Sequence, residues 1–162
     1  MMILIVVFLL SRYRCPISRT DDIKKMFPRV CLHSARRLVE EHAVGKRITS
    51  VVAVEQGGGP RCGLFDEIIF SNCSCAKAAE DALVGRTVVA VKRCGKHMWW
   101  QLSDGGPHLL CHFGMTGSIS LKAPGQHAIT AKYKSFSVDA KNWPPKFTKV
   151  EVLFADGTRL AL

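Results

Sequence analysis

The sequence lacks the cysteine and histidine spacings that usually hold structural zinc. Its seven cysteines are odd in number, and the chain contains neither a pair of C-x-x-C knuckles nor a histidine pair at zinc-finger spacing. We therefore predict no metal site. Several cysteines fall in apolar, strand-like runs, where a free thiol behaves as a small hydrophobic side chain, as is usual in a reducing compartment. The seven are Cys15, Cys31, Cys62, Cys73, Cys75, Cys94 and Cys111.

The sequence also lacks an apolar run long enough to cross a bilayer as a helix. Residues 1–10 are almost entirely apolar, but a spanning helix needs about 20 such residues. As a signal peptide, the run has no basic residues before it and no clear small-residue cleavage site after it. The stretch from Cys15 to Pro28 is polar and has no periodicity. We expect residues 1–32 to be an unstructured or atypical N-terminal extension. Secretion or membrane targeting is the less favoured alternative.

Acidic residues are scarce. The chain has 13 Asp and Glu against 23 Lys and Arg, which gives a formal net charge of +10. This excess favours a polyanionic partner, either nucleic acid or an anionic membrane surface. A hydrophobic content of 48% over 162 residues argues against disorder and provides enough apolar surface for one domain with a real core.

Two short helices are predicted, and each ends before a glycine. Ser34 is a suitable N-cap for an amphipathic helix over 34–44, and Gly45 follows it. A second helix over 76–83 is followed by Gly85, and both glycines lead into β-branched, strand-like sequence. Because this helix, glycine and strand pattern occurs only twice, it indicates local similarity between two halves of one sheet system rather than a repeat protein.

The rest of the chain is a series of short strands. Asp104-Gly105 and Asp156-Gly157 are strong hairpin signals. Short strands joined by tight turns predict an α+β, mainly β fold over residues 33–162, namely an antiparallel two-layered β-sandwich with flanking short helices. Alternation predicts five inward side chains in the later strands, Ile119, Leu121, Val150, Val152 and Phe154. The expected strands are 46–55, 86–93, 97–102, 109–113, 118–122, 133–138, 149–154 and 158–162.

Two polar clusters stand at the ends of predicted strands between Val88 and Gly117. The first is KRCGK, in which Lys96 follows a glycine in a tight basic turn, where its ammonium could reach a phosphate or act in acid–base chemistry. The second is HFGMTG, which contains His112 and Met115. A protruding methionine can be inserted between unstacked bases. A solvated lysine, a satisfied histidine and a core methionine are the alternative interpretation.

These segments resemble a known family. The helix SARRLVEEHAVGKRI is followed in order by ALVGRTVVAVKRCGKHMWWQL, HLLCHFGMTGSISL, AKYKSFS and KVEVLFADGTRLAL. In that order they resemble the N-terminal catalytic domain of the formamidopyrimidine-DNA glycosylase family, in its plant form. The resemblance implies a bifunctional base-excision repair enzyme, which removes oxidised purines such as 8-oxoguanine and then cleaves the abasic strand. Extrusion of the base would give the enzyme access to the damaged nucleoside.

The resemblance assigns roles to individual residues. Lys96 matches the lysine that contacts the backbone at the lesion and assists elimination, and Met115 matches the residue that fills the gap left by the extruded base. His112 matches a neighbouring histidine on the same DNA-facing edge. Lys132 matches the lysine of a phosphate-binding Lys-His pair, whose second member here is Tyr133. The full set of expected DNA-binding residues is Lys92, Arg93, Lys96, His112, Met115, Lys132, Tyr133 and Lys134.

The sequence departs from the family at its catalytic start. The family begins MPELPEVE, in which the proline is the Schiff-base nucleophile and the next glutamate is the acid. Counting back from the first helix places Phe27 at the proline and Pro28 at the glutamate. The resemblance also ends before the family's C-terminal DNA clamp and its zinc finger, where present. We therefore expect the domain to be incomplete at its C-terminal end and the chain to be inactive as a lyase.

Three functions remain open from the sequence. The first is a DNA glycosylase and abasic-site lyase by descent, the second is a noncatalytic DNA-binding or partner-binding domain, and the third is a secreted or membrane-tethered basic protein. The first implies damaged double-stranded DNA as partner, no small-molecule cofactor, a monomer and a nuclear location. It also predicts that Lys96, His112, Met115 and Lys132 gather along one edge of the sandwich.

Overall fold

The computed structural model describes residues 5–10, 30–71, 73–113, 117–132 and 142–162. The described part of the chain contains two sheets and two helices; after β1 and β2, strands β3 to β6 belong to the first sheet and β7 to β10 to the second. In chain order they are β1 (Ile5–Leu10), α1 (Val30–Ala43), β2 (Ile48–Val52), β3 (Phe70–Ser71), α2 (Ala76–Asp81), β4 (Val88–Cys94), β5 (His97–Leu102), β6 (His108–Phe113), β7 (Ser118–Lys122), β8 (Ile129–Lys132), β9 (Glu151–Phe154) and β10 (Arg159–Ala161).

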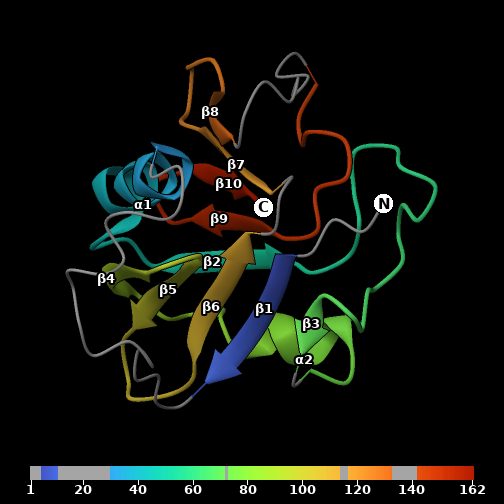
Figure 1. Cartoon of the computed structure of the whole chain (residues 1–162), viewed down its shortest axis with the longest axis horizontal. Coiled ribbons are helices and arrows are strands. Elements are labelled where there is room, and N and C mark those ends of the chain that lie inside the picture. Colours follow the sequence, from blue (N-terminus) through green and yellow to red (C-terminus); the bar gives the residue numbers. More distant parts are fainter. Residues whose placement is uncertain (1–4, 11–29, 72, 114–116, 133–141) are drawn as a thin grey trace.

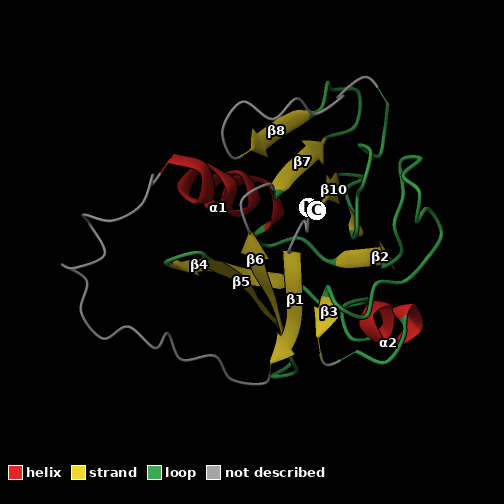
Figure 2. Cartoon of the chain, turned by 45° about the vertical axis from the view of Figure 1, so that its right-hand side comes forward, coloured by secondary structure: helices red, strands yellow, loops and turns green. Residues whose placement is uncertain are grey.

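Two five-stranded sheets form the body of the molecule (Figure 1). The first sheet has the order β3-β1-β6-β5-β4, and the second has the order β2-β9-β10-β7-β8. Among the described strands, all neighbours pair antiparallel except β1 and β3, which are parallel. Helix α1 packs against β4 of the first sheet and against β7 and β8 of the second, whereas α2 contacts β2 (Figure 2). The predicted α+β, mainly β class is confirmed.

One hydrophobic core joins the two sheets. All five side chains predicted to point inward, from Ile119 to Phe154, are at most 1% exposed. Trp100 of β5 is fully buried, and its ring lies 6.5 Å from that of Phe154 in β9. Because these two strands belong to different sheets, this aromatic pair bridges the layers. Aromatic side chains are well suited to this position because each buries a large apolar area.

The N-terminal segment contradicts the expectation that residues 1–32 lie outside the folded unit. Strand β1 takes residues 5–10 of it into the first sheet, where Ile5 pairs with Phe113 and Leu10 with His108. Helix α1 begins at Val30, four residues before the expected N-cap. The apolar run is therefore a strand inside the first sheet, paired with β3 on one edge and with β6 on the other. No helix within the described residues is both long and apolar enough to span a membrane.

The two helix, glycine and strand units join the sheets symmetrically. Gly45 donates its N–H to the Val88 carbonyl at 2.8 Å, and Gly85 donates its N–H to the Ile48 carbonyl, also at 2.8 Å. Both glycines have positive φ, 81° and 85°, which other residues adopt at a cost. The predicted similarity of the two units is thus present, but the units supply strands to different sheets rather than to one.

The cysteines differ from the predicted set of buried thiols. Cys111 is buried, but Cys62 and Cys75 are exposed and Cys73 is half-buried, and all four are free. Cys94 is disulfide-bonded. Exposure therefore separates the four free thiols into reactive and unreactive positions, because only an accessible thiolate can attack a reagent.

We expect thiol alkylation of the native chain to spare Cys111. Complete burial raises the pKa of the Cys111 thiol to about 12, so it is neither accessible nor ionised at pH 8. Peptide mapping after brief iodoacetamide treatment should show Cys62 and Cys75 modified and Cys111 unmodified. The same treatment in denaturant should modify all three, which controls for detection of each peptide. Fast labelling of Cys111 in the native chain would contradict the burial of β6.

Candidate nucleic-acid interface

A tight hairpin between β4 and β5 presents the first basic cluster. Cys94 pairs with His97, so the turn consists only of Gly95 and Lys96, and Gly95 has a φ of 58°. The Arg93 guanidinium donates to the Gly95 carbonyl at 2.9 Å, which fixes the turn from one side. The Lys96 side chain is exposed at the tip. The two-residue turn therefore requires a glycine at its first position and leaves the Lys96 side chain exposed at its second.

A second hairpin brings His112 beside the first cluster. Asp104 and Gly105 have positive φ values of 67° and 63°, the conformation expected of a two-residue hairpin turn. This turn sets the register in which His97 of β5 lies directly opposite His112 of β6. Their ring centres are 4.8 Å apart. In β5 the alternate residue Met98 is fully buried, so His97 points away from the core.

The electrostatics of this edge depend on lysine and arginine rather than on histidine. Burial lowers the pKa of His112, and the neighbouring His97 and Lys96 lower it further. Burial also lowers the pKa of His97. Both imidazoles are therefore mostly neutral at pH 7. The positive charge comes from Lys92, which is exposed on β4, from Arg93 and from Lys96.

A buried arginine supports the second hairpin. Arg86 donates to the carbonyls of Ser103 and Ala82, at 3.1 Å and 3.3 Å, and to the carbonyl of Pro107. Burial lowers its pKa from the usual value, with Asp104 acting in the opposite direction. The guanidinium thus fixes both ends of the β5–β6 loop against the residues that follow α2. Arg86 therefore stabilises the β5–β6 loop from inside the protein and is too buried to contact a ligand itself.

The expected site residues are only partly described. Lys96 lies near enough to His112 to lower the pKa of that imidazole, whereas the gathering of these two with Met115 and Lys132 along one edge stays a prediction. Lys132 is the last residue of β8 in the second sheet, where it pairs with Ser118. Strand β7, which holds Ser118, is the next strand along the chain after β6 but belongs to the other sheet. Outside the described residues lie Met115, Tyr133, Lys134, Phe27 and Pro28.

Sequence reasoning missed His97. The signal was present, because a two-residue turn centred on Asp104-Gly105 requires that residues 97 and 112 face each other. The alternation of β5, in which Met98 and Trp100 are buried, also placed His97 on the outer face. Within the described part of the chain, no group of three or more His, Cys, Asp or Glu side chains is arranged to hold a metal ion.

Comparison with known proteins identifies the family. The family model of the formamidopyrimidine-DNA glycosylase N-terminal domain matches residues 32–162. The chain belongs to this family. The formamidopyrimidine-DNA glycosylase of Arabidopsis thaliana is 31% identical over 131 residues, which cover 80% of this chain and 30% of that protein. That of Corynebacterium efficiens is 34% identical over 95 residues, covering 55% of this chain and 30% of that protein.

A solved structure shares the fold. The complex of Lactococcus lactis Fpg with DNA containing an abasic site aligns with a TM-score of 0.51 at 19% identity, and covers 83% of this chain and 39% of that one. The chain thus spans about a third of the length of the curated glycosylases that it matches. It corresponds to the N-terminal domain of the family and not to the whole enzyme.

Proposed function

We propose that this chain provides the N-terminal, DNA-contacting part of a base-excision repair glycosylase. The observation that carries the proposal is the juxtaposition of Lys96 and His112 on paired hairpins in a chain that belongs to the formamidopyrimidine-DNA glycosylase family. The partner is damaged double-stranded DNA. The Lactococcus lactis Fpg whose fold this chain shares was solved with DNA that contains an abasic site, which supports the same class of ligand here.

The hairpin cluster, consisting of Lys92, Arg93, Lys96 and His112, would contact phosphates. Lysine and arginine side chains at strand ends bind phosphate without reading sequence. Lys96 would take the auxiliary role of the family lysine beside the lesion, and Met115 would fill the space of the extruded base. Lys132, at the end of β8 in the second sheet, would extend the contact, and the resemblance adds Tyr133 and Lys134 to the same set. In this interpretation oxidised purines are the lesions removed by the full-length family enzyme.

The catalytic groups of the family are replaced at their expected positions. A Schiff base at the sugar C1′ requires an unprotonated terminal amine with an acid nearby, and Phe27 and Pro28 supply neither. We infer that glycosylase and lyase chemistry do not proceed from these two residues. This substitution favours the second candidate function, a noncatalytic DNA-binding or partner-binding domain, for the chain as it stands.

The remaining properties follow from the family function. The proposed chemistry uses no small-molecule cofactor, and the family's zinc finger belongs to a part of the protein beyond the domain matched here. A repair protein of a plant-type family would act in the nucleus, as a monomer on its duplex. A nuclear location can be checked by imaging a fluorescent fusion, and the monomer by light scattering.

The test of DNA binding is its salt dependence. For n phosphate contacts, log K falls against log salt with a slope of about −0.9n, so loss of one lysine should reduce the slope by about one. We expect Lys96→Ala to weaken duplex binding severalfold and to flatten the slope, as measured by fluorescence anisotropy between about 50 and about 200 mM salt, a range that includes physiological ionic strength.

A matched control makes this test specific to the hairpin cluster. Lys77 is exposed on α2 and pairs with Asp81 at 2.5 Å, so Lys77→Ala removes the same charge elsewhere. Its slope should equal that of the unaltered chain. Equal effects of the two substitutions would mean that net charge alone binds DNA, and the assigned interface would be wrong.

A further inference from the structure

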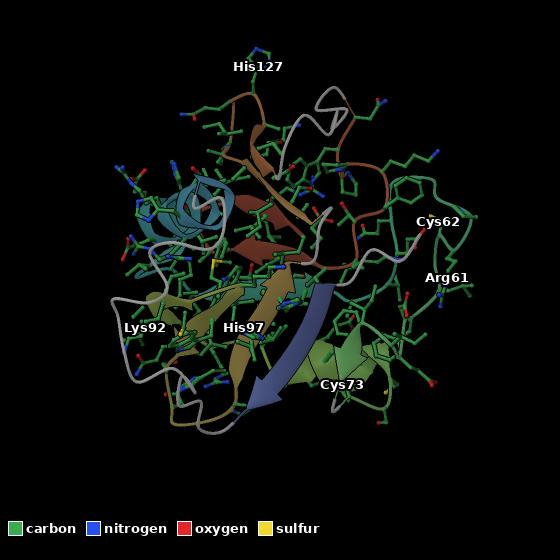
Figure 3. The ribbon with its side chains drawn as sticks, viewed as in Figure 1. Arg61, Cys62, Cys73, Lys92, His97 and His127 are labelled. Carbon is green, nitrogen blue, oxygen red and sulfur yellow. The ribbon has the colours of Figure 1, made fainter. Side chains whose placement is uncertain are left out.

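His97 of β5 and His112 of β6 form a cross-strand histidine pair that the proposed DNA contact does not by itself explain. His97 and His112 are direct neighbours on antiparallel strands and point to the same face of the first sheet. Their ring centres lie 4.8 Å apart and the rings are inclined by 46°. Figure 3 labels His97 on the part of the molecule formed by β4, β5 and β6, far from His127. The hydrogen-bonded strands hold the two backbones in register, so the Cα atoms need not move for both rings to reach one ligand.

We propose that His97 and His112 together bind one divalent transition-metal cation, such as Zn²⁺ or Ni²⁺. Imidazole nitrogens lie about 2.0–2.1 Å from zinc, so two imidazoles on adjacent coordination positions of one ion have ring centres roughly 5 Å apart. The observed 4.8 Å agrees with this requirement. Water molecules complete the coordination of the ion. Imidazole selects borderline cations over Mg²⁺ and Ca²⁺, which prefer oxygen ligands.

The protonation state of the pair suits this role. A histidine must be neutral to bind a metal, and burial lowers the pKa of both His97 and His112. The adjacent Lys96, which also lowers the pKa of His112, opposes a second positive charge and limits the affinity. Each imidazole has two ring nitrogens, so one can bind the ion while the other keeps a hydrogen bond. Cys94 pairs with His97, but its sulfur is held in a disulfide and is not a ligand.

Titration of the whole chain with Ni²⁺ tests the site without reference to DNA, so its failure would leave the proposed function untouched. Isothermal calorimetry should detect one ion per chain, and Mg²⁺ should give no heat. His97→Asn and His112→Asn should each weaken Ni²⁺ binding at least tenfold, whereas His127→Asn should not change it. His127 is exposed in the loop between β7 and β8 and serves as the matched single histidine.

Two further measurements keep the result interpretable. The exposed Cys75 and its neighbour Cys73 could also bind a thiophilic ion, so a Cys73→Ser, Cys75→Ser chain should retain the Ni²⁺ site. In proton NMR spectra of the unaltered chain, paramagnetic Ni²⁺ should broaden the ring signals of His97 and His112 before those of His127. This measurement uses no substitution, so its result does not depend on the folding of a variant. Binding that survives both histidine substitutions, or that disappears with the two serines, would overturn the proposal.

Discussion

We expect Lys149→Met to destabilise the chain by about 3–5 kcal/mol, the range for removing one partner of a buried ion pair. The Lys149 ammonium contacts the Glu55 carboxylate and lies 3.6 Å from that of Asp66. All three side chains are less than 10% exposed. Methionine keeps the length and apolar stem of lysine but leaves the two carboxylates buried without a full counter-charge. Urea unfolding, followed by tryptophan fluorescence, measures the loss.

An exposed ion pair gives the control for this expectation. Lys77 and Asp81 are also paired, but their side chains are 75% and 60% exposed, and such pairs contribute at most about 1 kcal/mol. Lys77→Met should therefore leave the urea midpoint almost unchanged. A small and equal effect of the two substitutions would contradict this expectation. It would mean that the Lys149 ammonium and the carboxylates of Glu55 and Asp66 are solvated rather than buried.

This cluster explains how a glycine-rich loop is held in a single conformation. Arg61 adds a second cation, 3.2 Å from Asp66, so two acids and two bases meet around the loop over 56–63. Gly57 has a φ of 79°, and a side chain on it would collide with the Pro145 carbonyl. The loop therefore packs directly on the segment before β9. Charge neutralisation and close backbone approach together compensate for the conformational freedom of its glycines.

The parts of the fold that depend on local chemistry could be predicted from the sequence. The bounds of β5 and β7 agree with the expected strands, because both alternate in polarity and end at recognisable turns. Gly45 follows α1 with positive φ, as expected of a C-terminal glycine. Helix α2 ends at Asp81 rather than at the expected residue 83, so Gly85, also at positive φ, lies in the turn after the helix and not at its C-terminus. The pairing of β5 with β6 follows from Asp104-Gly105. In each case residues within one or two turns of the chain determine the conformation.

The parts that depend on distant partners could not be predicted. Strand β1 is an apolar run without alternation, and its partner β6 is about 100 residues away along the chain, so no local pattern distinguishes it from a targeting segment. The buried pair of Lys149 and Glu55 joins residues separated by 94 positions. Strand β8, at residues 129–132, precedes the strand expected at 133–138, which lies outside the described residues.

The candidate site likewise has one part that the local sequence predicts and one part that depends on strand pairing. The exposed tip of Lys96 follows from a local turn, and the resemblance to the family assigned it a role. The contribution of His97 emerges only when β5 and β6 are considered as one hairpin, because the Asp104-Gly105 turn places His97 of β5 opposite His112 of β6. Sequence reasoning that treats each cluster separately therefore finds the lysine and misses the histidine pair.

The largest expected effect concerns covalent chemistry at an abasic site. A terminal amine nitrogen adds to C1′ of the open-chain aldehyde form of an abasic sugar and loses water to give an iminium (Schiff base), and borohydride transfers hydride to its carbon to leave a stable amine adduct. We expect the 162-residue chain to give no such adduct with abasic or 8-oxoguanine duplexes, because the resemblance to the family would place Phe27 and Pro28 at the nucleophile and acid positions. Denaturing gel electrophoresis of labelled DNA measures the product.

Recovery of the adduct should require two changes made together. One replaces residues 1–33 by MPELPEVE, which restores a terminal proline amine and its acid, and the other adds the C-terminal half of a family relative, which completes the DNA clamp. Either change alone should leave trapping at background, because a nucleophile without a clamp does not hold the flipped sugar and a clamp without a nucleophile forms no imine. An adduct formed by the unmodified chain and lost in Lys96→Ala would instead identify Lys96 as the nucleophile, and the assignment of Lys96 to an auxiliary role would be wrong.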